Sequence, residues 1–353
     1  MKRKVKLYII AAMVVCLLLS TFVMSGCTQD GGGGKGGGAV ATGGKVEAKA
    51  GNDKYKIGLA MNELVIDFYV AIDTRLRELC EERGWDYILL DAQGDINKQI
   101  ANMEDLVSQG CDMILINSFD TEVLTTAINS IVADGTPVIS IDNSLEAAAN
   151  VLTTVQCDNL GISKAVGEWL GDFMGSKPIR AVLISGAIGA SNSMERRQGM
   201  IAGVMEAQLR NNAKTDFTII NHGFTDWKEE VAVTVMEDTL SLNVDFNVLM
   251  TEVDYQAIAA MKVIDNAGKL NGVTVVAAAD GAKDALKLIQ SGDYGGAYGA
   301  TGLNLPTIIS EYTIQVCEEY FAGRTNFPDK IFTPAACINK KNVDEYYDPN
   351  SPF

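Results

Sequence analysis

The sequence predicts an α/β protein of two similar lobes, each a parallel, doubly wound sheet flanked by helices. From Tyr55 onward, short apolar runs rich in β-branched residues alternate with amphipathic stretches. This alternation is typical of parallel strands joined by helical crossovers that cover both faces of a sheet. The runs form two successive sets, and a chain of 353 residues is long enough for two domains.

The expected strands are apolar runs that end in polar residues or glycine. In the first set they lie at 55–61, 86–92, 112–118 and 137–142. In the second set they lie at 179–185, 217–223, 246–251, 273–279 and 296–301. The intervening stretches are predicted to be helices, as at 68–84, where the amphipathic pattern ends at the stop signal Gly84.

The first 27 residues have the features of a secretory signal. Basic residues precede an uncharged apolar run at 7–24, and Ser25, Gly26 and Cys27 follow it. The ending MSGC resembles the lipobox of bacterial lipoproteins, which implies a signal peptide at 1–26 and a lipid such as palmitate on Cys27. The alternative is a transmembrane anchor, because 18 apolar residues just span a bilayer. Either way, we expect the body of the protein outside the cytoplasmic membrane.

Residues 27–52 are expected to be a flexible tether between the lipid and the globular body. Ten of the 25 residues at 28–52 are glycine, and no large apolar residue is present there to pack. Such a composition behaves as a random coil, so the body could move near a partner in the membrane.

Composition and charge exclude several classes of protein. A hydrophobic content of 47% excludes a disordered chain, and a net charge of −16 disfavours nucleic-acid binding. His222 is the single histidine, which argues against histidine-based metal sites and catalysis. We therefore expect no metal, no cofactor and no enzymatic activity. The body has an odd number of cysteines and no CxxC motif, so one disulfide could form but its pairing is open among Cys80, Cys111, Cys157, Cys317 and Cys337.

Aromatic, carboxylate and amide side chains follow the predicted strands. In parallel sheets of this kind, ligands bind outside the carboxyl ends of the strands. The side chains expected at that edge are Phe68, Tyr69, Asp142, Asn143, Arg196, Trp227, Asp254, Asp280 and Asn304. Such a set suits a sugar or polyol, because rings pack on C–H faces and polar groups bind pairs of hydroxyls.

Each of these residues also has a structural interpretation. Asp142 and Asp280 could cap the helices that follow them. Phe68 and Tyr69 could face the core from an amphipathic helix. Trp227, expected in the first turn of a helix capped by Asp226 with Glu229, could pack between helix and sheet, and Arg196 could be solvated.

The same residues carry a resemblance to a known family. From about 55 to 345 the chain resembles the type I periplasmic binding proteins of ribose-class sugar ABC transporters. The matching stretches are IGLAMNELVIDFYVAI, DAQGDINKQIANMEDLVSQGCDMILIN, TPVISID, SNSMERRQGM, VVAAADG and NLPTII. The resemblance implies ring-sandwiching roles for Phe68, Tyr69 and Trp227. It implies polar ligand contacts for Asp142, Arg196, Asp280 and Asn304.

Three positions depart from the family pattern. Ile66 and Asp67 stand where the family often has Asn-Pro, and Asn143 stands where an arginine commonly follows the first carboxylate. Val253 replaces the usual asparagine before Asp254. These changes put ribose itself in doubt as the ligand.

The resemblance also implies an architecture and a mechanism. The first lobe is expected at 55–157 plus 305–334 and the second at 158–304 plus 335–347, joined by a three-crossover hinge. The lobes would close on the ligand, and the monomeric, lipid-anchored protein would deliver it to an ABC permease in the membrane. The alternative is a sugar-sensing receptor of the same fold that signals to a chemoreceptor or histidine kinase.

Two further readings are disfavoured. A LacI-type repressor shares the fold, but the signal sequence, the tether and the acidic charge argue against it. An extracellular glycosidase would need a carboxylate pair such as Asp142 and Asp280, and nothing in the sequence supplies the proton donor of raised pKa.

Overall fold

The computed structural model describes residues 54–353 apart from 119, 121 and 146. The signal peptide, the lipidation of Cys27 and the tether predicted at 27–52 lie outside the described residues. Within the described part, no helix combines the length and the apolar character needed to cross a bilayer.

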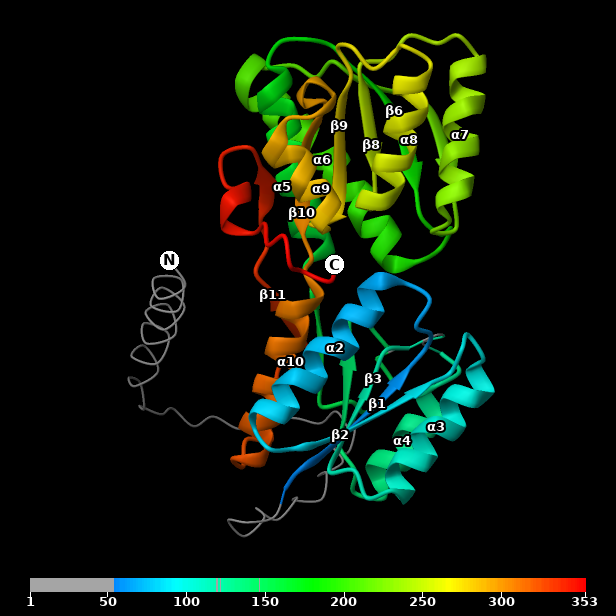
Figure 1. The fold of residues 1–353 in the computed structure, drawn as a ribbon, viewed down its shortest axis with the longest axis vertical. Coiled ribbons are helices and arrows are strands. Elements are labelled where there is room, and N and C mark those ends of the chain that lie inside the picture. Colours follow the sequence, from blue (N-terminus) through cyan, green and yellow to red (C-terminus); the bar gives the residue numbers. More distant parts are fainter. Residues whose placement is uncertain (1–53, 119, 121, 146) are drawn as a thin grey trace, which may run out of the picture. The chain divides into compact units, whose positions relative to one another are not determined.

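Two six-stranded sheets form the framework, and each belongs to one lobe (Figure 1). The first sheet has the strand order β11-β5-β4-β3-β1-β2, and all its pairings are parallel. Its strands are β1 (Lys56–Met61), β2 (Asp86–Asp91), β3 (Met113–Ile116), β4 (Val138–Ile141), β5 (Thr153–Cys157) and β11 (Lys330–Thr333).

Helices cover both faces of the first sheet, as the burial of its central strands requires. On one face, Leu76 of α2 and Ile314 of α10 pack with Leu59 and Leu115 in a single apolar cluster. On the other face, Leu106 of α3 and Ile128 of α4 pack against Ile114 and its neighbours. These helices are α2 (Asp67–Glu82), α3 (Ile96–Ser108), α4 (Thr125–Ala133) and α10 (Pro306–Phe321).

The second sheet repeats this plan with the order β12-β10-β9-β8-β6-β7. Its pairings are parallel except that the short edge strand β12 runs antiparallel to β10. The strands are β6 (Ile179–Ser185), β7 (Phe217–Phe224), β8 (Val248–Thr251), β9 (Thr274–Asp280), β10 (Tyr298–Leu303) and β12 (Cys337–Asn339).

The second sheet is also covered on both faces. Buried residues of α7, α8 and α9 form one core with the sheet, and residues of α5 and α6 form the other. Gly167 lets α5 lie directly on α6, because a Cβ there would stand 2.2 Å from the carbonyl oxygen of Met200. These helices are α5 (Asn159–Met174), α6 (Ser191–Asn212), α7 (Glu229–Ser241), α8 (Asp254–Asn266) and α9 (Lys283–Ser291).

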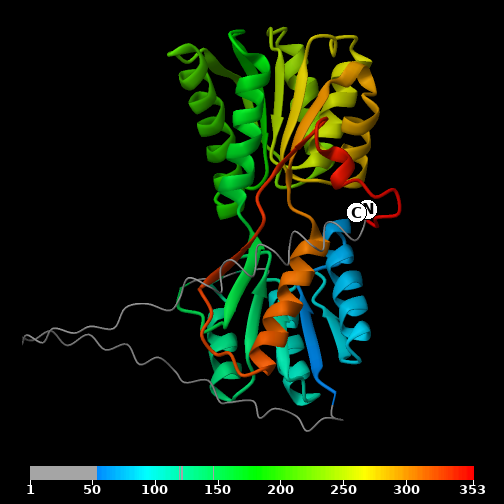
Figure 2. The same cartoon turned by 90° about the vertical axis from the view of Figure 1, so that its left-hand side faces the viewer.

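The chain passes between the sheets three times within the described residues (Figure 2). The passages follow β5 at residue 158, β10 at residues 304–305 and β11 at residues 334–336. The carboxyl ends of β4, β9 and β10 therefore lie close to the junction of the lobes. The residue limits predicted for each lobe stay a prediction.

The two-lobed α/β fold is confirmed, and all nine predicted strands are present. Three strands were not predicted: β5, β11 and β12. The interpretation of Trp227 as part of a helix was wrong. Asp226 and Trp227 have φ of 52° and 61° in the loop before α7, which begins at Glu229 without a side-chain cap.

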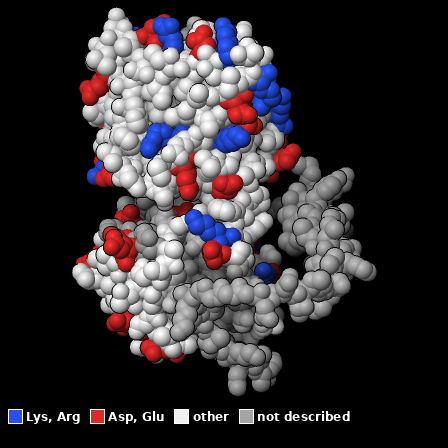
Figure 3. All heavy atoms as spheres, turned by 180° about the vertical axis from the view of Figure 1, so that it is seen from behind, with Lys and Arg blue, Asp and Glu red and all other residues white. Residues whose placement is uncertain are grey.

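The surface of the described chain carries charges of both signs. Figure 3 shows Lys and Arg side chains lying among Asp and Glu side chains on the second lobe. Exposed ion pairs of the second lobe include Arg210 with Asp172 at 3.0 Å. Exposed pairs of this kind contribute little to stability, so the stability of each lobe comes mainly from its own apolar cores.

Candidate functional site

A cavity of about 700 Å³ lies between the two lobes at the carboxyl ends of the strands. Its walls contain seven of the nine predicted site residues. They are Phe68, Tyr69, Asp142, Arg196, Trp227, Asp280 and Asn304. These seven residues therefore lie as predicted, with aromatic and polar side chains of both lobes on one cavity.

The first-lobe wall is the start of α2. Phe68 and Tyr69 lie in its first turn with ring centroids 5.9 Å apart and ring planes at 77°. Phe68 is 7% exposed and packs into the first-lobe core, so the core interpretation and the cavity interpretation both apply to it. Asp67, also in the first turn, lies where the helix dipole favours an acidic side chain.

Asp142 follows β4 and is held in a left-handed backbone conformation with φ of 66°. Its amide donates to the carbonyl of Val155 at 2.8 Å, which fixes the turn after the strand. Burial raises the pKa of Asp142 to about 6, against the opposing effects of Arg196 and of a hydrogen bond with Asn117. Asp142 is therefore an acceptor on the cavity wall whose ionised form is poorly solvated.

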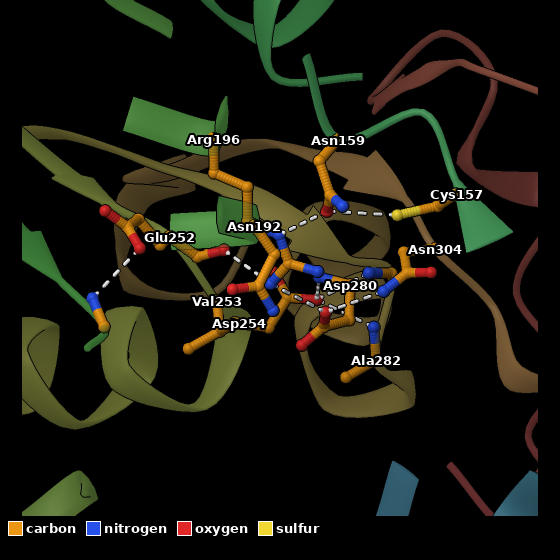
Figure 4. A network of polar contacts seen from close by, with 12 residues as sticks. Cys157, Asn159, Asn192, Arg196, Glu252, Val253, Asp254, Asp280, Ala282 and Asn304 are labelled. Atoms are coloured by element: carbon orange, nitrogen blue, oxygen red, sulfur yellow. Dashed lines mark hydrogen bonds and ion pairs between the residues drawn. The ribbon is translucent and has the colours of Figure 1, made fainter. Parts of the chain in front are cut away.

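Arg196 of α6 is the centre of the polar network on the second lobe (Figure 4). Its Nε donates to Oδ1 of Asn159 at 2.8 Å, and its guanidinium lies 3.6 Å from the carboxylate of Asp280. The guanidinium also donates to the carbonyl of Glu252 at 3.4 Å. Arg196 is only 5% exposed, so the interpretation of a solvated arginine was wrong.

The charges of this network support one another. Burial acts to lower the pKa of Arg196, but Asp280, Cys157 and Asp142 together raise it above the ordinary arginine value. Burial raises the pKa of Asp280, while Arg196 and a hydrogen bond from Asn304 oppose that effect. Arg196 is thus a buried cation that is paired with Asp280 and whose pKa is also raised by the Asp142 carboxylate of the first lobe.

Asn304 follows β10 at the second passage between the lobes. Its Nδ2 donates to Oδ1 of Asp280 at 3.3 Å, and its backbone amide donates to the Asp280 carbonyl at 2.9 Å. Its Oδ1 is buried and has no hydrogen-bond partner among the described residues. Because buried acceptors are normally paired, this oxygen is available to a ligand hydroxyl.

Trp227 forms the aromatic wall of the second lobe. Its ring lies on Gly186, where a Cβ would stand 2.3 Å from the nearest ring carbon. Its carbonyl accepts a hydrogen bond from the hydroxyl of Tyr255 at 2.8 Å, and its ring lies 5.9 Å from the Arg196 guanidinium. The residue is thus fixed by its neighbours on the cavity side rather than between helix and sheet.

Asp254 and Asn143 do not belong to the cavity walls. Asp254 is fully buried and accepts hydrogen bonds from the amides of Asp280, Gly281 and Ala282, and from the Tyr298 hydroxyl at 2.6 Å. It therefore shapes the loop that carries Asp280 instead of facing a ligand. Asp280 does not fill the capping role considered for it, because α9 begins at Lys283 without a side-chain cap.

Asn143 acts behind the first-lobe wall. Its Nδ2 donates to the carbonyl of Ser118 at 3.2 Å. Burial, followed by Asp142, raises the pKa of Tyr69, and hydrogen bonds with Asn62 and Asn143 oppose this effect. Asn143 is thus held by Ser118 and lies close to Tyr69 without facing the cavity.

Several cavity residues were not predicted. Asn159, Asn192 and Tyr255 line the second lobe, and Phe353 lines the cavity from far along the chain. Asn159 follows β5, whose sequence TTVQC has no continuous apolar run, so the strand and its polar end were both missed. A search for polar residues after every short β-branched segment would have found it.

The side chains on the cavity walls are of the kinds that pack on C–H faces and form hydrogen bonds with hydroxyl groups. Aromatic rings face it from both lobes, and a guanidinium, carboxylates and amides are placed between them. The described residues contain no group of three His, Cys, Asp or Glu side chains arranged to hold a metal ion. The five cysteines of residues 54–353 are free.

The sequence matches the periplasmic binding protein domain family over residues 57–325. The ribose import binding protein of Bacillus subtilis is 30% identical over 278 residues, which cover 78% of this chain and 85% of that protein. The xylitol-binding protein of Mycolicibacterium smegmatis is 23% identical over 305 residues, 85% of this chain and 82% of that protein.

Solved structures show the same fold. An ABC transporter solute binding protein from Mycobacterium smegmatis with bound glycerol has a TM-score of 0.73 and 25% identity, covering 85% of this chain and 99% of that one. A solute binding protein from Bacillus halodurans with bound myo-inositol has a TM-score of 0.72 and 18% identity, covering 84% and 99%.

Proposed function

We propose that this chain, which belongs to the periplasmic binding protein family, captures a neutral monosaccharide or related polyol between its lobes and delivers it to the permease of an ABC importer. Members of this family bind solutes and are not enzymes. The observation that carries the proposal is the position of Arg196. It is buried beside Asp280 and Asn159 and electrostatically coupled to Asp142 of the other lobe, with aromatic rings on both sides.

A neutral ligand agrees with the charges of the cavity. Carboxylates outnumber cationic groups on its walls, and they are Asp67, Asp142, Glu229, Glu230, Asp280 and Asp284 against Arg196, Lys228 and Lys283. An anionic ligand such as a sugar phosphate would be repelled by this excess. A polyol can donate to Asp142 and Asp280 and accept from Arg196 without adding a charge.

The relatives support a small hydroxylated ligand without fixing which one. The Bacillus subtilis relative is a binding protein for ribose import, and the Mycolicibacterium smegmatis relative binds xylitol. Asp67 and Asn143 replace residues usual in the ribose-class pattern, and Asp67 lies on the cavity wall while Asn143 lies close to Tyr69. We therefore propose a ligand of this size and polarity that differs from ribose in its hydroxyl arrangement.

Ligand capture requires that both lobes contact one molecule. A ligand that bridges Asp142 and Arg196 binds the closed arrangement better than the open one, and this difference in affinity shifts the population towards closure. The three passages between the lobes are where such a movement would be absorbed. The closed, monomeric protein would dock on the permease, and the lipid expected on Cys27 would keep it at the outer face of the membrane.

Thermal unfolding of the purified full chain against pentoses, hexoses, deoxysugars, polyols and inositols tests the proposal. A compound present at 100 times its Kd should stabilise the protein by about 2.7 kcal/mol. Trp227→Ala should abolish the shift, whereas the matched control Asp226→Asn, at an exposed neighbour outside the cavity walls, should retain it. If no compound shifts the transition, the sugar assignment is wrong.

A further inference from the structure

Residues 348–353 extend from the second lobe to the first. They follow the short helix η2 (Val343–Glu345), and Val343, Tyr346 and Tyr347 pack with the second-lobe core. Phe353 instead packs against the first-lobe core. Figures 1 and 2 both place this end of the chain beside the start of α2. The segment therefore contacts both lobes in addition to the three passages between the sheets.

Hydrogen bonds hold the segment in this position. The ammonium group of Lys283, at the start of α9, donates to the carbonyl of Ser351 at 2.7 Å. The Ser351 amide donates to the carbonyl of Asp348 at 3.0 Å, and its hydroxyl donates to the Phe353 carbonyl at 2.7 Å. The segment is thus folded on itself and attached to the second lobe before it reaches the first.

The ring of Phe353 meets the ring of Phe68 edge to face, with centroids 5.3 Å apart and planes at 84°. Pro352 and Phe353 both belong to the cavity walls, as does Lys283. Phe353 therefore stands next to one of the two aromatic residues of the first-lobe wall, on the same cavity. The geometry is one that aromatic pairs favour beyond simple burial.

We propose that residues 348–353 form an additional wall of the ligand site and that Phe353 determines which ligands fit. This inference rests on the proposed function and deepens it. The wall comes from the second lobe and rests on Phe68 of the first, so it narrows the cavity beside the sugar-stacking ring. The site therefore selects unsubstituted monosaccharides or polyols and rejects those that carry a substituent at the position facing Phe353.

Calorimetric titration of the full chain in detergent tests the selectivity. The probes are D-ribose, D-allose, xylitol and myo-inositol, together with the mono-O-methyl derivatives of whichever compound binds. We expect the wild type to reject at least one derivative tenfold or more relative to the parent compound, and Phe353→Ala to bring that ratio within threefold. Phe353→Tyr should keep the wild-type ratio. The control Phe332→Ala removes a ring that is 49% exposed and lies outside the cavity walls, and it should change nothing.

A measurement without ligand tests the position of residues 348–353 separately from ligand binding. Hydrogen exchange of the Ser351 and Phe353 amides should be at least tenfold slower in the wild type than in Lys283→Met, which loses the bond to Ser351. Equal, unprotected exchange in both proteins overturns the wall whatever the ligand is. If a parent compound binds, and the ratio of its affinity to that of its O-methyl derivative is the same in the wild type and Phe353→Ala, only the role of Phe353 in ligand selection is overturned. If the segment is protected but no probe binds, the proposed function fails, and the wall fails as part of a ligand site.

Discussion

Replacing Asp142 by asparagine should stabilise the ligand-free protein at neutral pH while destroying its binding of ligand. Burial raises the pKa of this carboxyl from 3.8 to about 6, so its ionised form is less stable in the folded protein than in the unfolded chain. Asparagine has the same shape without the charge and tolerates the left-handed conformation of φ 66° found here. The substitution therefore removes an electrostatic penalty without adding backbone strain.

The size of the expected stabilisation by Asp142→Asn follows from the folded and unfolded pKa values of Asp142. Because the folded pKa is raised, Asp142 favours folding below pH 3.8, and this contribution is lost as pH rises through about 6. A difference of one in pKa between the folded and unfolded states corresponds to about 1.4 kcal/mol. Half-burial of the side chain screens part of the effect, so we expect Asp142→Asn to raise the free energy of unfolding at pH 7 by about 1–3 kcal/mol.

Urea denaturation of both proteins between pH 3.5 and pH 7.5 measures the difference. The two stability curves should run parallel below about pH 4, diverge between pH 4 and pH 6, and stay apart above that range. Asp226→Asn is the matched control, because Asp226 also has a left-handed backbone but is exposed. Equal stability of wild type and Asp142→Asn at pH 7, or a gap of the same size at pH 3.5, would show that the ionised Asp142 carboxylate does not destabilise the folded protein.

Three other substitutions test the supporting contacts. Arg196→Met leaves the buried carboxylate of Asp280 unpaired and should lower the free energy of unfolding, measured by urea titration, by about 3–5 kcal/mol. The double variant Arg196→Met with Asp280→Asn should recover most of this loss, and no recovery would contradict the ion pair. Asp254→Ala should lower the free energy of unfolding by about 2–4 kcal/mol, because three amides and a tyrosine hydroxyl lose their acceptor. It should also weaken ligand affinity in calorimetry. Unchanged stability would show that these hydrogen bonds are dispensable. Gly186→Ala should weaken binding at least fivefold in the same assay, because the new methyl group displaces the Trp227 ring, and full retained affinity would remove Trp227 from the site.

The fold could be predicted because its central strands are encoded locally. Runs such as VISI in β4 and VLMT in β8 are buried and three-quarters apolar, and the stretches between the strands have a helical period. The missed strands lack that signal. β5 buries Thr153, Thr154 and Gln156 among its five residues, and β12 has only three residues, so both owe their pairing to the neighbouring strands.

The site could be predicted in part because the carboxyl ends of parallel strands meet at one edge of a sheet. That rule locates Asp142, Asp280 and Asn304, but it does not say where a side chain points. Asp254 has the same kind of position and turns inward to the amides of the next loop. A residue that does not follow a strand has no sequence pattern that places it at the site. Phe353 is such a residue, and it reaches the cavity because residues 348–352 run from the second lobe to the first.

In the proposed function, side chains from both lobes hold one hydroxylated ligand. Isothermal titration calorimetry of the full chain tests this arrangement, with the compound that gives the largest thermal shift in the wild type as the ligand of wild type, Asp142→Ala and Arg196→Met. We expect a single site in the wild type and at least a tenfold loss of affinity in each variant, because Asp142→Ala changes the first lobe and Arg196→Met changes the second. Retained affinity in either variant, with both proteins folded, would contradict a ligand shared between the lobes.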